Sequence, residues 1–247
     1  MNQKTNKTSQ AMLKMIMLAM LVAIGVVISP ILRVEGMCPM AHLINIVCAV
    51  LLGPWYSLLC AVLIGILRML FMGIPPLALT GAVFGAFLSG VLYRASKGKL
   101  IFAVIGEVIG TGIIGAIVSY PVMTFLWGRE GLTAFFYIPS FISGTLIGGA
   151  VAFIFLKELA KNKLLGKFQQ ALGSKVCEGS INVWSDSIGI AFLGIIGYLA
   201  VLVLRNRLNF KGIAFYAPHI ILVLFVAFAV IYLIINKKTK KESPQTN

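Results

Sequence analysis

Residues 100–120, LIFAVIGEVIGTGIIGAIVSY, form an uninterrupted apolar stretch with a single charged residue, Glu107. A helix needs about 20 mostly apolar residues to cross a bilayer, so this stretch is long enough to do so. The whole chain has the same character. Of its 247 residues 60% are hydrophobic and 11% are charged, against about 25% charged in a soluble domain. The sequence therefore predicts an all-α integral membrane protein.

On either side of this stretch, hydropathy and turn residues predict further spans. A break at Gly53-Pro54 makes the second span short, and Pro121 is expected to end the fifth. Spans are expected at residues 11–29, 42–52, 55–72, 77–93, 100–120, 136–155, 188–204 and 213–235. We therefore expect a six-helix domain at residues 1–160, a basic cytoplasmic linker at 161–180, an additional transmembrane hairpin at 181–236 and a disordered tail at 237–247.

Clusters of lysine and arginine between the apolar runs predict the orientation. Of the 21 basic residues, 15 lie at residues 4–14, 94–99, 157–175 and 237–241. The positive-inside rule places these segments, and with them both termini, in the cytoplasm of a multi-pass protein of the cell membrane. The net charge of +14 is attributed to such topology signals and to contacts with anionic lipid, and not to nucleic acid.

Small residues recur every four positions on several predicted helices, which places them on one helix face. Such stripes let helix backbones approach closely in lipid. Most are expected to pack within the chain, and at least one is a candidate for docking another membrane protein. The stripes are Ala19 and Ala23; Gly81, Gly85 and Ser89; Gly106 and Gly110; and Gly144, Gly148 and Ala152.

Two charged residues, Arg68 and Glu107, fall within predicted spans. A charge there costs about 2.5–3.5 kcal/mol or more on insertion scales, so each is expected to have a partner or a task. A rise of 1.5 Å per residue puts their depths on the order of 10 Å apart. A direct pair would therefore need helix tilt or a long arginine reach. A structural ion pair or hydrogen-bonded brace and a role in ligand binding both remain open.

The outer connection carries further polar side chains: Arg33, Glu35, Cys38, His42 and Asn45. His42 and Asn45 are three apart and share a helix face, where they could hydrogen-bond a small polar heterocycle. Cys38 and His42 lack the further ligands that structural zinc needs, so no metal site is predicted. Trp127 and Tyr137 fit an aromatic belt or stacking on a ring ligand.

The sequence contains no H-E-x-x-H, G-x-S-x-G or P-loop motif, so neither catalysis nor ATP hydrolysis by this chain is predicted. Uphill transport would need another subunit to hydrolyse ATP. A membrane-embedded enzyme using Glu107, Arg68 and His42 is the alternative of another class. It requires these residues to converge in one water-accessible cavity, whereas a non-binding scaffold would have no polar pocket.

Four segments carry a family resemblance: residues 38–45, CPMAHLIN; 51–56, LLGPWY; 106–112, GEVIGTG; and 119–121, SYP. Together they resemble the substrate-binding S components of energy-coupling factor vitamin transporters, in particular the ThiW type. The resemblance covers residues 10–160. It implies a six-helix fold, a ligand near the outer face beneath the first loop, and uptake of hydroxyethylthiazole, a thiamine precursor. Another vitamin or small heterocycle is the alternative substrate.

The resemblance also implies partners. Ala19 and Ala23 match an A-x-x-x-A stripe that docks the transmembrane T subunit, which in turn joins two ATPases. ATP hydrolysis by those partners is thought to topple the S component so that its site faces inward, and no cofactor of its own is implied. The resemblance says nothing about residues 188–235, which could obstruct toppling.

Overall fold

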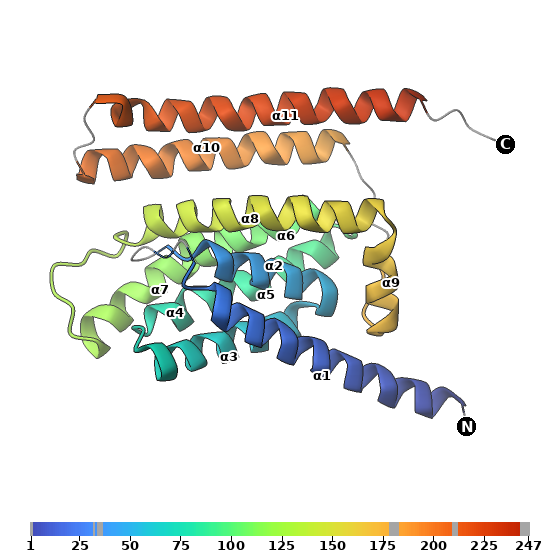
Figure 1. Ribbon diagram of the computed structural model, residues 1–247. Coiled ribbons are helices and arrows are strands. Elements are labelled where there is room, and N and C mark those ends of the chain that lie inside the picture. Colours follow the sequence, from blue (N-terminus) through green and yellow to red (C-terminus); the bar gives the residue numbers. More distant parts are fainter. Residues whose placement is uncertain (1, 32, 34–36, 178–182, 209–211, 243–247) are drawn as a thin grey trace. The chain divides into compact units, whose positions relative to one another are not determined.

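The computed structural model describes residues 2–31, 33, 37–177, 183–208 and 212–242. The chain divides into two compact units, Met1–Gly179 and Ser180–Asn247. Among the described residues, seven helices are long and apolar enough to cross a membrane, and one further apolar helix is shorter (Figure 1). This confirms the predicted all-α membrane bundle.

The first unit contains the six predicted helical spans. They are α1 (Asn2–Ile28), α2 (Pro39–Leu52), α3 (Pro54–Met72), α4 with α5 (Leu77–Thr80 and Ala82–Ala95), the series α6, η1, α7 and η2 (Leu100–Ile109, Gly110–Gly115, Ala116–Pro121 and Val122–Leu126) and α8 (Ile138–Lys161). In the series, η1 and η2 are π-helical.

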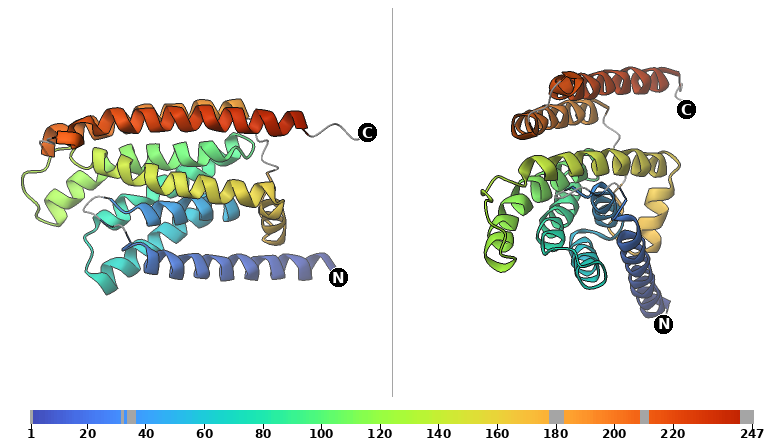
Figure 2. Two further views of the ribbon diagram at one scale, coloured as in Figure 1. Left: turned by 45° about the horizontal axis from the view of Figure 1, so that its top comes forward. Right: turned by 60° about the vertical axis from the view of Figure 1, so that its left-hand side comes forward.

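The short helix α2 lies at the centre of this unit. Its 14 residues span about 21 Å, less than the roughly 30 Å hydrocarbon core of a bilayer. Twelve of them are buried, because α1, α3, α5, α6 and α8 pack around the helix (Figure 2). Gly53 ends α2 with a φ of 96°, and Pro54 opens α3. The predicted break is therefore confirmed, and α2 is shielded from lipid.

The prediction that Pro121 ends the fifth span is wrong. The helical path continues through α7 and η2 to Leu126. A proline has no N–H to donate, and its ring crowds the preceding turn of a regular α-helix. Here π-helical segments precede α7 and follow Pro121, and their wider turns accommodate the changed hydrogen-bond ladder without breaking the helix.

Glycines on α6 and η1 allow backbone contact with α5. A Cβ added to Gly106 would lie 2.7 Å from the Leu88 carbonyl oxygen, and one added to Gly110 would lie 2.5 Å from the Phe84 oxygen. Such distances are shorter than real Cβ contacts, so only glycine fits. The prediction that these stripes pack within the chain is confirmed. On α1, by contrast, Ala19 and Ala23 are exposed.

The predicted linker at residues 161–180 is wrong, because most of it packs as part of the first unit. Helix α9 (Leu164–Ala171) carries Gln169, which is fully buried. Its Nε2 donates to the Val50 carbonyl at 2.9 Å and to the Tyr93 hydroxyl at 3.1 Å. Its Oε1 accepts from the backbone N–H of Cys177 at 3.2 Å. These bonds hold α9 against the ends of α2 and α5.

The second unit is a helical hairpin of α10 (Val183–Leu208), η3 (Gly212–Tyr216) and α11 (Ala217–Glu242). Its two long helices pack side by side (Figures 1 and 2). The buried Tyr232 hydroxyl donates to Asp186 Oδ2 at 2.8 Å. The prediction of disorder from residue 237 is wrong as far as residue 242, because lysine and glutamate extend a helix readily. Residues 243–247 lie outside the described part of the chain.

Candidate functional site

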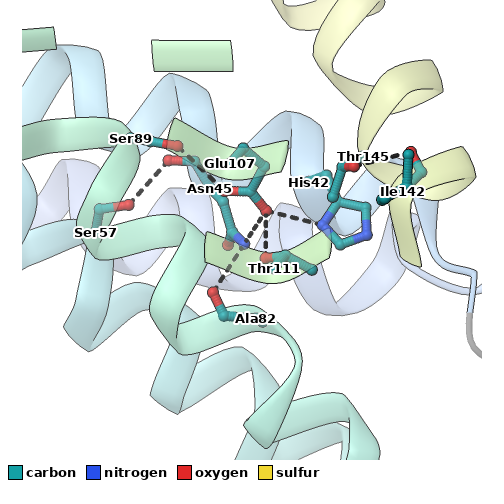
Figure 3. Close-up of polar contacts among 9 residues, drawn as sticks. All are labelled: His42, Asn45, Ser57, Ala82, Ser89, Glu107, Thr111, Ile142 and Thr145. Carbon is teal, nitrogen blue, oxygen red and sulfur yellow. Dashed lines mark hydrogen bonds and ion pairs between the residues drawn. The ribbon is translucent and has the colours of Figure 1, made fainter. Parts of the chain in front are cut away.

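A carboxylate in the interior of the first unit collects four hydrogen bonds (Figure 3). Glu107 is fully buried. Its Oε1 lies 2.8 Å from His42 Nδ1, 3.0 Å from Asn45 Nδ2 and 3.1 Å from Thr111 Oγ1, and its Oε2 accepts from Ser89 Oγ at 3.2 Å. We call these five residues the Glu107 cluster. With every neighbour acting as a donor, the carboxyl group is satisfied in a setting where an unpaired charge would be very costly.

Local helix geometry assembles the cluster from three spans. His42 and Asn45 are one turn apart on α2, and Glu107 and Thr111 are one turn apart where α6 passes into η1. Gly85 on α5 leaves the room for them, because a Cβ there would clash with the Thr111 hydroxyl and lie 2.8 Å from the Glu107 carboxylate. The backbone of Asn45 is also fixed, because Ser57 Oγ donates to its carbonyl oxygen at 2.9 Å.

The contact with Glu107 fixes the orientation of the His42 ring. With Glu107 as a carboxylate, its oxygen accepts the proton of Nδ1, and Nε2 of a neutral ring is then an acceptor. His42 also lines a pocket, and its Nε2 lies beside Gly144 of α8. The cluster therefore holds one histidine at the wall of a cavity with a defined hydrogen-bonding role.

The pocket itself contains about 600 Å³ of space, including its open mouth. Its polar lining consists of Arg33, Cys38, His42, Arg68 and Thr111, and its apolar lining includes Met37, Ile74, Pro75, Leu77 and Phe141. Its walls come from α2, α3, α4, α5, η1, α8 and the chain between α1 and α2. An apolar cavity with a few polar groups suits a small heterocycle.

Apart from the two aromatic residues, the predicted site residues fall into three groups. Arg33, Cys38, His42 and Arg68 line the pocket, and Cys38 Sγ also contacts the Ser29 carbonyl oxygen at 2.9 Å. Asn45 and Glu107 do not line the pocket. Glu107 contacts the pocket residue His42, and Asn45 contacts Glu107. Glu35 lies outside the described residues.

The two aromatic candidates do not line the pocket. Trp127 has an exposed fraction of 52%, whereas Tyr137 is buried. Burial raises the pKa of the Tyr137 hydroxyl, against a smaller lowering by the Arg129 charge. The Tyr137 ring centroid lies 5.7 Å from that of Phe141, which does line the pocket. Tyr137 thus supports the wall that Phe141 forms, while the exposure of Trp127 suits a belt residue.

Within the described chain, Arg68 and Glu107 form no ion pair. Glu107 is the centre of a hydrogen-bonded brace that includes His42, one of the two structural interpretations that the sequence left open. Arg68 is 3% exposed and lines the pocket. Its Nε has no hydrogen-bond partner among the residues that the structure describes.

Sequence reasoning missed Thr111 and Phe141 as members of the site. Thr111 lies four residues after Glu107, so helical spacing alone would have placed it on the same face. Phe141 follows the start of α8 and carries no signal that separates it from any other apolar residue of a membrane helix.

Apolar helices long enough to cross a membrane, with a pocket beside a buried polar cluster, define a multi-pass membrane protein with a candidate small-molecule site. Residues 15–162 match the family model described as thiamine-precursor transporter protein (ThiW). The chain therefore belongs to the ThiW family of thiamine-precursor transporters. No curated protein and no solved structure gives a significant match to it. The matched residues include the whole Glu107 cluster and every pocket residue.

Proposed function

We propose that this protein is the substrate-binding subunit of an energy-coupling factor importer and that it binds hydroxyethylthiazole. The observation that carries the proposal is the position of His42, which is held by Glu107 at 2.8 Å and lines the pocket. Family membership supports a thiamine precursor as the transported compound.

The pocket chemistry suits this ligand. The ring of hydroxyethylthiazole would pack against Phe141, Ile74 and Leu77, which form an apolar wall. Its hydroxyl group would donate to His42 Nε2. This nitrogen acts as the acceptor because Nδ1 carries the ring proton and donates it to Glu107. A site built to pair with a hydroxyl group discriminates strongly against analogues that lack one, because its polar atom would be left unpaired.

The proposed orientation places the pocket on the outer side. The pocket residues Arg33, Met37 and Cys38 lie between the end of α1 and the start of α2. With the N-terminus in the cytoplasm, as the distribution of basic residues predicts, this connection lies outside. Solute would then enter the pocket from the exterior without nucleotide.

The proposed partners are a T subunit and two ATPases, which would hydrolyse the ATP. Helix α1 supports this assignment, because Leu18, Leu21 and Val22 are buried against the bundle while Ala19 and Ala23 are exposed. A pair of small side chains one turn apart allows the close approach of another membrane helix.

Equilibrium dialysis of the purified protein with labelled hydroxyethylthiazole, in the absence of ATP, tests the proposed function. We expect saturable binding of one ligand per chain and recovery of the ligand unchanged. Saturable binding of only a different vitamin would replace the substrate and keep the class of protein. Failure of every vitamin and precursor to bind, or chemical conversion of the ligand, would refute the proposal.

Docking is tested separately with Ala19→Leu and Ala23→Leu. Bulky side chains should block the approach of the T subunit, so we expect uptake by cells to be lost while the purified protein still binds ligand. Met20→Leu is the matched control, because Met20 is exposed on the same helix. Loss of ligand binding in Ala19→Leu and Ala23→Leu would show that these two alanines serve packing within the chain.

The positions of His42, Arg68 and Glu107 give little support to the alternative of a membrane-embedded enzyme. His42 and Arg68 line one pocket, but Glu107 is fully buried and its oxygens already accept four hydrogen bonds. A general base must reach the proton that it removes. Glu107 acts instead on the orientation of His42.

A further inference from the structure

The side chain of Arg68 is charged, buried and without a counter-ion among the described residues. It lies on α3, is 3% exposed and lines the pocket. Its Nε has no hydrogen-bond partner in the described part of the chain. A guanidinium group keeps its charge in proteins, and charged groups at membrane depth normally pair with another group or face a water-filled cavity. Arg68 faces the cavity.

Glu107, which is buried inside the first unit, does not neutralise the charge of Arg68. Glu107 accepts from His42, Asn45, Thr111 and Ser89 and does not line the pocket. The described lining holds two guanidinium groups, those of Arg33 and Arg68, and no carboxylate. The described lining therefore carries a net positive charge and contributes a positive potential to the pocket.

The start of α2 adds to this potential. Cys38 and Ala41, from its first turn, line the pocket, and Cys38 caps the helix without a side-chain hydrogen bond. The N-terminal end of a helix carries a partial positive charge and favours anions. Two arginines and a helix start thus bear on the same cavity.

We infer that the pocket binds an oxyanion form of the thiazole precursor, either a carboxylate or a phosphate ester, more tightly than neutral hydroxyethylthiazole, and that the oxyanion binds Arg68. The inference rests on the proposed function and refines its substrate class, because hydroxyethylthiazole itself is neutral. The apolar wall at Phe141 would hold the ring, and the oxyanion would supply the counter-charge that Arg68 lacks in the described chain.

Competition binding to the purified full-length protein tests the inference with three probes: hydroxyethylthiazole, its phosphate monoester and 4-methylthiazole-5-carboxylate. A hydrogen bond to a charged group is roughly twice as strong as one between neutral groups. We therefore expect at least one anionic probe to bind about tenfold tighter or more than the neutral alcohol. The two anionic probes show whether the oxyanion is an ester or a carboxylate.

Variants assign the preference to Arg68. Arg68→Met should remove the preference for the anion while keeping binding of the neutral probe, which also shows that the variant folds. Arg68→Lys should keep part of the preference, because it keeps the charge but loses the planar fork of donors. Lys167→Gln is the control, since Lys167 is exposed on α9 and does not line the pocket; it should leave the preference unchanged.

Three results separate the inference from the function that it refines. Equal affinity for neutral and anionic probes would overturn the inference and leave the proposed function intact. Failure of all three probes and of every vitamin would refute the proposed function as well. An anion preference that appears only in Glu35→Gln would identify Glu35 as the counter-ion of Arg68, and this too would overturn the inference.

Discussion

The two units of the chain use the same apolar helices but bury very different amounts of polar chemistry. The buried polar side chains of the first unit include His42, Asn45, Arg68, Glu107 and Gln169. In the described part of the second unit, α10 and α11 bury Asp186 and Ser187, with a bond from Tyr232 to Asp186. A polar group in lipid is costly, and a hairpin packs with few of them. In the first unit two of these buried residues, His42 and Arg68, line a pocket, and this points to a ligand.

Removal of the carboxylate at the centre of the Glu107 cluster should have the largest effect. Glu107→Leu leaves four donors without their acceptor, and a buried donor left unpaired costs about 1–3 kcal/mol. We expect a large drop in the thermal unfolding temperature in detergent and no ligand binding. Glu107→Gln, which keeps the shape and one acceptor oxygen, should lose less. An unchanged unfolding temperature in Glu107→Leu would mean that the cluster is not a structural centre.

Replacement of the histidine should weaken binding more than it weakens the fold. In His42→Ala the ligand loses its acceptor at the pocket wall, an interaction that contributes about 0.5–1.5 kcal/mol for neutral partners. We expect up to about tenfold weaker binding of hydroxyethylthiazole in the dialysis assay. Asn45→Ala is the companion variant, because Asn45 contacts Glu107 without lining the pocket, and it should change affinity less. Unchanged affinity in His42→Ala would remove this residue from the site.

The matching change in the second unit should affect stability alone. Tyr232→Phe removes the hydroxyl that donates to Asp186 at 2.8 Å, at a cost of about 1–3 kcal/mol. We expect a modestly lower unfolding temperature for the hairpin and the same affinity for ligand. Weaker ligand binding in this variant would show that the polar pair of the second unit serves the site after all.

Truncation after Gly179 should have the smallest effect on ligand binding. The pocket residues and the Glu107 cluster all lie within Met1–Gly179. We expect the truncated protein to bind hydroxyethylthiazole as the full chain does. Uptake by cells, measured alongside, shows whether the hairpin matters at the later step. Loss of binding in a truncated protein that is still folded would break the contrast between the two units.

The sequence predicts the helical framework well, because spans and breaks depend on local chemistry. The short α2 follows from Gly53-Pro54, whose residues disfavour helix continuation whatever surrounds them. The outcome at Pro121 could not be foreseen, since it depends on π-helical turns on either side of α7. The packing of α9 was missed for a similar reason, because it rests on Gln169 reaching carbonyl and hydroxyl groups on two other helices.

The candidate site was predictable in chemistry but not in arrangement. Helical spacing placed His42 and Asn45 together, and the insertion cost singled out Arg68 and Glu107. The estimated difference in depth disfavoured a direct pair between those two, and none forms in the described chain. The carboxylate partner of His42 could not be identified, because tilt and rotation between α2 and α6 decide which side chains meet. Such long-range geometry leaves no trace in local spacing.

Alkylation of Cys38 tests most directly whether ligand occupies the pocket over the Glu107 cluster. This free thiol is half-buried and lines the pocket, whereas Cys48, Cys60 and Cys177 are buried. The rate of its reaction with a small maleimide would be measured by mass spectrometry with and without saturating hydroxyethylthiazole. We predict that ligand slows modification of Cys38 and leaves the other cysteines unaffected. An unchanged rate at Cys38, under conditions where dialysis shows the ligand to be bound, would place the ligand elsewhere and contradict the account.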